Sequence, residues 1–312
     1  MSTDLADAKH IPVLLEEVLA YLQVKEGGTY VDCTVGAGGH CYRIAEKVGS
    51  QGRVIGIDRD QEAIEVARKR LSRFLDRVEL VRADFRDLRI VLDDKGVSKV
   101  DGFLFDLGVS SLQLDNAGRG FSYMHSGPLD MRMDQRLSVT AYDLVNQLPE
   151  DELARIIELY GEERWAKRIA RQITLRRNRA TIATTKDLVD IIKEAIPARA
   201  RRRGPHPAKR TFQALRIAVN QELDAIPLGL QVAVRYLALG GRICVISFHS
   251  LEDRIVKRYF QELSRGAAVE PLPGLKMRMV TKKAIRPQEL EAKVNPRARS
   301  ARLRVIEKVE GF

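Results

Sequence analysis

The sequence is poor in cysteine, with only Cys33, Cys41 and Cys244 among 312 residues. An odd number of widely spaced cysteines forms neither a disulfide framework nor a Cys-x-x-Cys metal pair, so each is expected to be a small buried hydrophobe. No cluster of histidine and aspartate has metal-ligand spacing, and no required metal is expected. No apolar run approaches the roughly 20 residues that span a bilayer, and residues 1–10 are too polar for a signal peptide. We therefore expect a globular, cytoplasmic protein without a membrane segment.

The chain does contain a glycine-rich junction between an expected strand and an expected helix. Residues 30–33 form a short run typical of a β-strand, and Gly36, Gly38 and Gly39 follow before an amphipathic segment that begins near Cys41. Glycine tolerates positive φ and lets the backbone approach a ligand, while a helix N-terminus presents free N–H groups. For this motif alone a glycine-rich turn without any ligand stays open, because short glycine patterns often arise by chance.

A carboxylate farther along the chain favours a nucleoside ligand. The apolar run Val54-Ile-Gly-Ile ends in Asp58, 22 residues beyond Gly36. A carboxylate at the tip of the second strand of a βαβ unit binds the hydroxyls of a ribose. The third glycine of a dinucleotide fingerprint is replaced by Cys41, which weakens a nicotinamide cofactor, and no P-loop Gly-Lys-Ser/Thr follows any glycine-rich turn. S-adenosylmethionine suits the pattern best, because it needs no pyrophosphate cradle.

The charge balance is strongly positive, with 53 Lys and Arg against 42 Asp and Glu, a net charge of +11 and a pI near 9.6. A basic surface favours phosphate backbones through counterion release, although net charge alone does not separate RNA from DNA or from an anionic membrane. One such cluster is often only a solvated face, but several beside a nucleoside-binding domain favour a nucleic-acid interface. The clusters are Arg164, Lys167, Arg168 and Arg171 at helical spacing, then Arg176, Arg177 and Arg179, and the run from Arg199 to Arg210.

Strands alternate with helices in the first third of the chain. Expected strands at residues 30–33, 54–57, 78–81 and 100–105 imply a parallel doubly wound sheet, in which ligands bind at the carboxyl ends of the strands. Asp58, Asp84 and Asp106 follow three of these strands directly or closely. Asp84 with Phe85 has two interpretations: an acid and a ring that bracket an adenine, or a surface acid beside a core phenylalanine.

No convincing strand is found between residues 115 and 207. Helices are expected there at 140–147, 149–177 and 185–195, with Thr140 and Asp143 as a capping box. The sheet pattern resumes with a helix at 209–239 and strands at 242–247, 277–284 and 302–309, and Ser250 with Asp253 is expected to cap the helix after the first of these. The predicted architecture is α/β, with residues 1–114 and 208–312 as one domain and residues 115–207 as a helical insertion domain.

Several long blocks, spread almost from end to end, resemble one family of enzymes. They are Val31-Asp-Cys-Thr-Val-Gly-Ala-Gly-Gly-His, Ile57-Asp-Arg-Asp, Asp106-Leu-Gly-Val-Ser-Ser-Leu-Gln-Leu-Asp, Arg119-Gly-Phe-Ser-Tyr, Gly127-Pro-Leu-Asp-Met-Arg-Met-Asp, Tyr160-Gly-Glu-Glu-Arg, Arg210-Thr-Phe-Gln-Ala-Leu-Arg-Ile, Ser247-Phe-His-Ser-Leu-Glu-Asp-Arg and Asn295-Pro-Arg-Ala-Arg-Ser. In these blocks the chain resembles the bacterial 16S ribosomal RNA cytosine-N4 methyltransferases, called MraW or RsmH.

The resemblance implies a class I S-adenosylmethionine methyltransferase (Rossmann-like) sheet with an inserted all-helical domain. It implies N4-methylation of a cytidine in the decoding region of 16S ribosomal RNA within the small ribosomal subunit, with S-adenosyl-L-methionine as cofactor. A homodimer is a further partner that only the resemblance suggests. Together with Gly36 and Gly38 of the glycine-rich loop, the cofactor-binding residues that it implies are Gly39, His40, Cys41, Asp58, Phe85, Asp106 and Gln113.

Asp106 is the expected catalytic residue. The amino lone pair of cytosine is delocalised into the ring, and a hydrogen-bond acceptor on its N–H groups would localise it; Asp106 or the Leu107 carbonyl lies where such an acceptor is needed. Better-known amino methyltransferases carry Asp/Asn-Pro-Pro-aromatic at this point, whereas this chain has Asp106-Leu-Gly-Val. The aromatic that stacks on the target base is therefore open, and the candidates are Phe121, Tyr123 and Phe248.

Three further side chains have two interpretations each. Asp130 and Arg132 are expected either to contact RNA or to orient their loop, and His249 is either a general base or a buried, hydrogen-bonded histidine. Two other functions also stay open: methylation of another nucleic-acid amino group, DNA included, and a ribosome-binding factor that keeps the fold without turnover. The intact glycine loop, Asp58 and Asp106 favour the enzyme.

Overall fold

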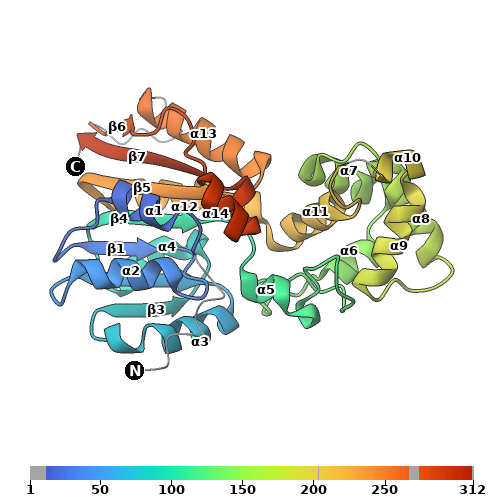
Figure 1. The fold of residues 1–312 in the computed structure, drawn as a ribbon, viewed down its shortest axis with the longest axis horizontal. Coiled ribbons are helices and arrows are strands. Elements are labelled where there is room, and N and C mark those ends of the chain that lie inside the picture. The colour runs from blue at the N-terminus through green and yellow to red at the C-terminus, as the bar shows by residue number, and fades with distance from the viewer. Residues whose placement is uncertain (1–11, 203, 267–273, 311–312) are drawn as a thin grey trace. The chain divides into compact units, whose positions relative to one another are not determined.

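The computed structural model describes residues 12–202, 204–266 and 274–310, which form two compact units (Figure 1). Unit 1 is Met1–Gly108 with Leu223–Phe312, and unit 2 is Val109–Glu222. Unit 2 extends beyond the expected insertion because α11 (Lys209–Asn220), expected in the sheet domain, packs on α7 (Glu150–Gly161). No helix in the described ranges is long and apolar enough to cross a membrane.

Unit 1 is built on a seven-stranded sheet of order β3-β2-β1-β4-β5-β7-β6. The strands are β1 (Thr29–Asp32), β2 (Arg53–Asp58), β3 (Val78–Arg82), β4 (Val100–Asp106), β5 (Leu237–Ser247), β6 (Lys276–Met279) and β7 (Arg302–Glu310). The neighbours from β3 to β5 pair in parallel, and β7 is antiparallel to both β5 and β6. This arrangement confirms the expected Rossmann-like class I sheet.

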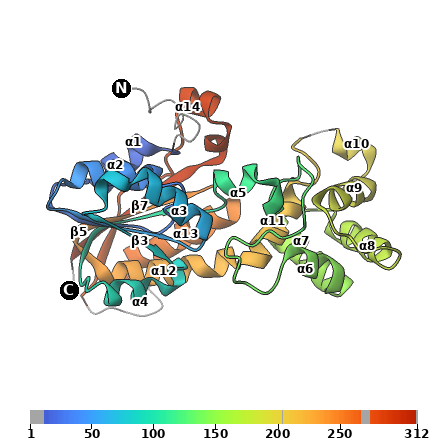
Figure 2. The same cartoon turned by 90° about the horizontal axis from the view of Figure 1, so that it is seen from below.

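Helices cover both faces of this sheet (Figure 2). On one face α1 (Leu15–Leu22) packs on β4 and β5, α2 (Gly39–Val48) on β1 and β2, and α3 (Gln61–Arg70) on β2 and β3. On the other face α4 (Leu88–Asp94), α12 (Glu222–Tyr236) and α13 (Ser250–Ser264) share an apolar core with side chains of β1, β2, β4 and β5. The strands can carry continuous apolar runs because both faces are covered. Shorter elements are η2 (Ser72–Phe74), η3 (Phe85–Asp87), α14 (Glu289–Val294) and η5 (Pro296–Ser300).

Unit 2 is helical and has its own apolar core. In addition to α7 and α11 it contains α5 (Ser111–Asp115), η4 (Ala117–Arg119), α6 (Ala141–Gln147), α8 (Ala166–Arg177), α9 (Thr185–Ala195) and α10 (Ala198–Arg201). The capping box of Thr140 with Asp143 at the start of α6 is confirmed, since the threonine hydroxyl accepts from the Asp143 amide and the Asp143 carboxylate accepts from the Thr140 amide.

Two predicted helices are each broken in the structure. Residues 149–177 form α7 and α8, and residues 209–239 form α11, α12 and the start of β5. The breaks lie at Glu162 (φ 48°) and Gln221 (φ 50°), a left-handed conformation that non-glycine residues adopt only when their surroundings stabilise it. The Arg210 guanidinium donates to the Glu162 carbonyl at 2.7 Å, and Arg216 pairs with Glu222 at 2.9 Å. These contacts stabilise turns that the helical sequence pattern does not predict.

Candidate active site

Carboxylates gather at one edge of the sheet in unit 1. Asp32, Asp58 and Asp106 are the last residues of β1, β2 and β4, and β1 lies between the other two strands. A fourth carboxylate, Glu252, comes from the first turn of α13, directly after β5. The negative charges interact: Asp58 raises the pKa of Asp32, and Asp32 and Glu252 raise the pKa of Asp106. Ionisation of Asp32 and Asp106 is therefore disfavoured by their acidic neighbours.

Asp32 holds the start of the glycine-rich loop. Its carboxylate accepts hydrogen bonds from the amides of Thr34, at 3.2 Å, and Cys41. The side chain is buried, and among the described residues its Oδ2 atom has no hydrogen-bond partner. Burial, and then the charge of Asp58, raise the pKa of Asp32 to about 7, against the two amides that lower it. Asp32 is not among the site residues expected from the sequence, although it ends the buried strand that precedes the loop.

Asp58 closes the loop from the neighbouring strand. Its Oδ2 accepts from the Gly36 amide and its Oδ1 from the Asp60 amide, both at 2.9 Å. Burial raises the pKa of Asp58, and these two amides oppose that shift. A carboxylate has about four lone-pair sites, so both oxygens can still accept a hydroxyl each. The expected role of Asp58 as a ribose acceptor is compatible with these bonds.

Glycine is required for a different physical reason at Gly36 than at Gly38 and Gly39. A Cβ at Gly39 would lie 2.4 Å from Pro12 Cγ, and a Cβ at Gly38 would contact Ala67 and Leu71 at 3.3–3.4 Å, so both permit close packing. A Cβ at Gly36 would meet only the Thr34 carbonyl, at 3.9 Å, and Gly36 has a φ of +50°. Gly36 is thus the position where the backbone faces open space, as a ligand-facing loop requires.

His40 is a buried, neutral histidine beside the central acid. Its Nε2 lies 3.0 Å from the Val13 carbonyl, which only accepts, so Nε2 carries the proton and Nδ1 is unprotonated. Burial lowers the pKa of His40 to about 4, partly offset by that hydrogen bond. The Nδ1 atom lies 3.7 Å from Asp106 Oδ2. The neighbouring Cys41 thiol is buried, and burial followed by the Asp32 charge raises its pKa.

Asp106 is held by its backbone and has an unsatisfied carboxylate. Its amide donates to the Thr34 hydroxyl at 2.6 Å. Oδ1 is buried and lacks a hydrogen-bond partner within the described ranges, while about a quarter of the side chain is exposed (26%). Burial first, and then the charges of Asp32 and Glu252, hold the pKa of Asp106 well above the usual range. A carboxylate with these properties is ready to accept a donor from a ligand.

The cap of α13 differs from the prediction. Ser250 with Asp253 was expected to cap this helix, but His249 is the N-cap: its Nδ1 accepts from the Glu252 amide at 3.4 Å, and Glu252 Oε2 accepts from the amides of Phe248 and His249. Asp253 instead pairs with Arg302 and Arg304, outside the cap. His249 thus caps the helix through Nδ1, while its Nε2 lies 3.1 Å from Glu252 Oε1, and these contacts favour the second of its two interpretations, a buried, hydrogen-bonded histidine. Its i, i+3 spacing to Glu252 was the sequence signal for this box.

Asp84 and Phe85, the pair that could bracket an adenine, both make contacts within unit 1. The Phe85 ring is buried and meets Phe105 edge-on, with centroids 5.6 Å apart. Asp84 accepts from the Arg86 amide at 2.9 Å and pairs with Arg59 at 3.3 Å and Arg86 at 3.1 Å. The contacts of both residues favour the interpretation of an acid beside a core phenylalanine.

Phe248 is the aromatic candidate that belongs to this edge. It follows β5 directly and is half-buried. A Cβ at Gly108, which has a φ of +91°, would lie 3.7 Å from the Phe248 ring and from Glu252 Oε1. Phe248 thus lies beside the Asp106-Leu-Gly segment within unit 1.

The other candidates belong to unit 2. Phe121 is buried in the core of that unit, and the Tyr123 ring stacks on His206 with centroids 4.7 Å apart. Gln113 is buried and completes a capping box with Ser110 at the start of α5. Each of these three side chains therefore makes packing or capping contacts within unit 2.

Asp130 and Arg132 form a bidentate ion pair within their loop. Arg132 Nε and Nη2 donate to the two Asp130 oxygens at 2.8 and 2.7 Å, and Arg132 Nη1 donates to the carbonyls of Gln135 and Leu137. Although burial opposes it, hydrogen bonding to Arg132 lowers the pKa of Asp130. The pair orients its loop, which is one of the two roles expected for it.

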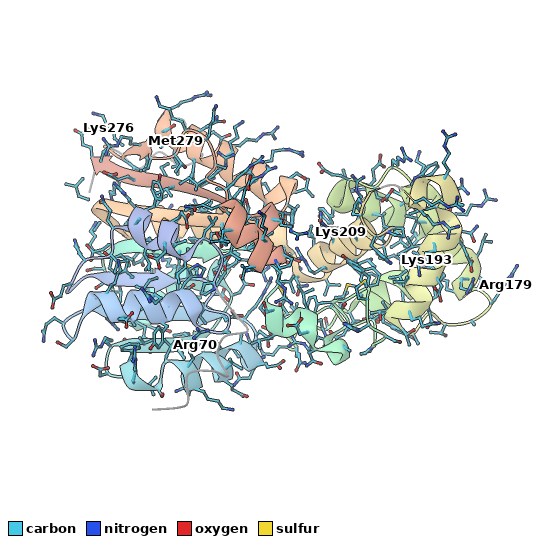
Figure 3. All side chains as sticks on the ribbon, viewed as in Figure 1. Arg70, Arg179, Lys193, Lys209, Lys276 and Met279 are labelled. Atoms are coloured by element: carbon cyan, nitrogen blue, oxygen red, sulfur yellow. The ribbon has the colours of Figure 1, made fainter. Side chains whose placement is uncertain are left out.

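Unit 2 carries an exposed basic surface on α8. Trp165 lies between two guanidinium groups, those of Arg164 and Arg168, at 4.9 and 5.4 Å from its ring. Arg179 is exposed and extends away from the helices of its unit (Figure 3). Not all of the basic run is available, because Arg177 donates to the carbonyls of Val145 and Leu148 at the end of α6. In the described part of the chain no ion pair involves Arg164, Lys167, Arg168, Arg171 or Arg179.

The carboxyl edge fits a cationic ligand. Across the described ranges no lysine or arginine pairs with Asp32 or Asp106, and each has a buried oxygen without a partner. Acidic neighbours raise the pKa of Asp32 and Asp106, and a bound positive charge would lower both. No group of three or more His, Cys, Asp or Glu among the described residues has the geometry of a metal site. An organic cation with hydroxyl groups for Asp58 matches this edge.

The buried Asp32 makes the stability of the protein depend on pH. Its pKa is raised in the folded chain, so its contribution to stability is complete below about pH 4 and is lost as the pH rises through about 7. We expect Asp32→Asn to gain about 2 kcal/mol in free energy of unfolding relative to the wild type between about pH 5 and pH 7. Urea unfolding at a series of pH values measures this difference. The lowered pKa of His40 has the opposite effect on stability, but it is present in both proteins and cancels in the difference. Exposed Asp94→Asn is the control, and a pH-independent difference for Asp32→Asn would contradict the prediction.

Comparison with known proteins gives one consistent result. The family described as the MraW methylase family matches residues 7–309. Ribosomal RNA small subunit methyltransferase H of Heliobacterium mobile is 54% identical over 308 residues, covering 96% of this chain and 99% of that protein. The protein of the same name from Brevibacillus brevis is 52% identical over 307 residues, covering 96% and 98%. A solved rRNA methylase structure from Streptococcus thermophilus covers 96% of this chain at 11% identity with a TM-score of 0.46, too distant to inform the site.

Proposed function

The chain belongs to the MraW methylase family, and from that premise we propose that it transfers a methyl group from S-adenosyl-L-methionine to N4 of a cytidine in the decoding region of 16S ribosomal RNA. The observation that supports this most is the partly exposed Asp106 carboxyl group, which pairs with no lysine or arginine in the described ranges and has a buried oxygen without a hydrogen-bond partner there. The names of the relatives support RNA of the small ribosomal subunit as the substrate, in the cytoplasm.

When bound, S-adenosyl-L-methionine supplies an electrophilic methyl group on a positively charged sulfonium. The carboxylates of Asp32, Asp106 and Glu252 favour that charge, because each is more stable when ionised next to a cation. Asp58 accepts the ribose hydroxyls, and Gly36 leaves space for the ligand to approach the loop backbone. Packing around the loop is the proposed contribution of the remaining residues of this set, Gly38, Gly39, His40, Cys41 and Phe85. The resemblance also implies Gln113 as a residue that contacts the cofactor.

Asp106 prepares the acceptor nitrogen. Its carboxylate accepts a hydrogen bond from the cytosine amino group, which draws the lone pair out of the ring and towards the methyl carbon. Formation of the N–C bond would break the bond between the methyl carbon and the sulfonium sulfur and leave a neutral thioether; the nitrogen would become cationic, and Asp106 would take its surplus proton. Once the positive charge of the sulfonium is gone, burial and the neighbouring acids would again raise the pKa of Asp106 and favour uptake of that proton. Positioning the nitrogen about 3–3.5 Å from the methyl carbon supplies much of the remaining rate enhancement.

Phe248 is the proposed stacking residue for the target base, since it is half-buried beside Gly108 within the same unit as Asp106. Phe121 and Tyr123 engage the core and His206 of unit 2 and act as supports. Asp130 and Arg132 orient their loop, and the exposed arginines of α8 bind RNA phosphates.

A methyl-transfer assay with three acceptors tests the proposal. Labelled S-adenosylmethionine is incubated with small ribosomal subunits, protein-free 16S RNA or duplex DNA, and the product nucleosides are identified by mass spectrometry. N4-methylated cytidine in RNA, and none in DNA, is expected. Methylation of DNA would favour a different amino methyltransferase, and cofactor binding without transfer to any acceptor would favour a non-catalytic ribosome-binding factor.

The ribose role of Asp58 is separable from its role in the loop. Asp58→Ala is expected to weaken binding of S-adenosylmethionine about 100-fold, because a hydrogen bond to a charged group contributes roughly 1.5–3 kcal/mol. The 2′,3′-dideoxy analogue of the cofactor should lose much less affinity, since it lacks the hydroxyls that Asp58 would accept. Calorimetric titration of both ligands measures the difference. If both lose the same factor, Asp58 acts only by holding the Gly36 amide.

A further inference from the structure

A second site in unit 1 has the opposite charge. It is an open cavity of about 430 Å³ between α13, the start of β7 and the segment after β6. One carboxylate, Asp253, lies in its wall among basic side chains. The basic residues that line it are Lys257, Lys282, Lys283, Arg286, Arg302 and Arg304.

Asp253 fixes two arginines in the inner part of this basic cavity. Arg304 donates to Asp253 through Nε at 2.7 Å and Nη2 at 3.1 Å, and Arg302 donates through Nη1 at 2.8 Å. Although burial opposes the shift, hydrogen bonds from Arg304 and then Arg302 lower the pKa of Asp253, so its charge is retained. Both arginines keep further N–H donors, and they are held in place before any ligand binds. Such preorganisation reduces the entropy lost on binding.

The outer residues of the basic cavity have no counter-charge of their own. Lys257, Lys282, Lys283 and Arg286 are exposed, and none of them pairs with an acid in the described part of the chain. Some other cations of the unit are paired, for example the largely buried Arg242 with Glu307 at 3.0 Å. Several unpaired cations around one hollow attract counterions, and a polyanion that releases those counterions binds with an entropic gain.

The basic cavity opens at the same edge of the sheet as the candidate active site. Ser247 at the end of β5 pairs with Arg302 at the start of β7, and α13, which carries Asp253, begins three residues after Ser247. β6 runs from Lys276 to Met279 (Figure 3), antiparallel to β7, so the segment that follows it reaches the same edge. The amide of Ile285 in that segment donates to the Leu303 carbonyl.

We propose that this basic cavity binds the phosphodiester backbone of the RNA strand that carries the target nucleotide. The proposal rests on the proposed function. Phosphate is the ligand chemistry that fits, because guanidinium groups bind its oxygens in pairs and lysines neutralise its charge. A cavity lined by cations along its length suits successive phosphates of one strand better than a single carboxylate. The backbone contacts position the strand and carry no sequence information.

The test removes the outer charges and leaves the inner arginines and the active site intact. The cavity variant combines Lys257→Gln, Lys282→Gln, Lys283→Gln and Arg286→Gln. Its control removes the same number of exposed lysines and arginines from α2, α3 and the turn before β4, none of which is ion-paired within the described ranges. The control substitutions are Lys47→Gln, Arg68→Gln, Lys69→Gln and Lys99→Gln. Calorimetric binding of S-adenosylmethionine, unchanged in both, shows that each variant is folded.

The readout is binding of a 20-nucleotide single-stranded RNA at several salt concentrations. The cavity variant should bind about 10- to 100-fold more weakly near 0.1 M salt, with a salt slope reduced by about 2, while the control changes by less than threefold. Equal losses in the two variants would overturn the proposal, because net charge alone would explain them. Binding of pyrophosphate to both variants is measured as well. A cavity variant that loses pyrophosphate binding but keeps its RNA affinity would also overturn the proposal, because the cavity would then bind a free anion.

Methyl transfer by the wild type is scored separately, so the two proposals can fail independently. If the wild type methylates no RNA and the cavity variant still loses RNA binding, the cavity proposal stands and the proposed function fails. If the wild type methylates RNA and the cavity variant binds it like the control, the proposed function stands and the cavity proposal fails.

Discussion

Replacement of Asp106 by alanine is expected to lower kcat for methyl transfer about 10³-fold while leaving the protein as stable as before. The loss is large because the carboxylate acts where charge develops, and one such group typically contributes 10²–10³ in rate. Stability is not expected to fall, because burial and the charges of Asp32 and Glu252 destabilise the ionised form of Asp106 in the folded protein. A drop in rate without a drop in melting temperature separates catalysis from folding.

Asparagine at the same position gives the finer comparison. Asp106→Asn keeps an oxygen that accepts a hydrogen bond but loses the charge and the basicity, so kcat should fall about 10-fold to 100-fold. In the wild type kcat/KM should decline on the acid side at a pH above the ordinary aspartate range, since the pKa of Asp106 is raised. That decline should disappear in Asp106→Asn. Single-turnover rates measured between about pH 5 and pH 9 test both expectations.

Asp94→Ala is the control for this series, because Asp94 is an exposed aspartate at the end of α4. It should leave kcat, KM and the pH profile unchanged. Wild-type rates in Asp106→Ala would remove Asp106 from the chemistry and return attention to the Leu107 carbonyl.

The sheet and its carboxyl edge were predictable because they depend on local patterns. The β-rich runs that end at Asp58 and Asp106 have one favourable conformation, and parallel pairing brings their ends together whatever the details of packing. The place of the glycine-rich loop was predictable for the same reason, since its glycines occur at a strand–helix junction. The separate reasons for Gly36 and Gly39 required knowledge of what lies against each one.

The sequence could not show which distant residues meet. Glu252 reaches the carboxyl edge from a helix that begins more than two hundred residues after β1. The turns at Glu162 and Gln221 depend on arginines elsewhere in unit 2, and no proline or left-handed glycine marks them. His249 caps α13 although serine is the usual capping residue and stands next to it. The position of Glu252 and the turn at Glu162 depend on tertiary contacts, whereas the His249 cap is a local i, i+3 contact in which histidine takes the place of the usual serine.

Loss of Asp253 is expected to be the most destabilising single change in unit 1 among those considered. Arg304 is almost fully buried, with 8% of its side chain exposed, and its ion pair within the described residues is with Asp253. Asp253→Ala would leave this guanidinium buried without its carboxylate, which typically costs 3–5 kcal/mol. The melting temperature should fall by about 10 °C, because a domain of this size loses about 2–4 °C per kcal/mol. Calorimetric scanning with the cofactor absent measures the shift.

The double variant Asp253→Ala with Arg304→Met separates the cost of an unpaired charge from a general loss of packing. Removing both charges leaves no buried ion without a partner, so at least half of the lost stability should return. Glu310→Ala is the matched control on the same strand, since its pair with Lys276 is exposed and should contribute less than about 1 kcal/mol. If the double variant were as unstable as Asp253→Ala, the aspartate would act through helix packing, and the inner arginines of the basic cavity would not depend on it.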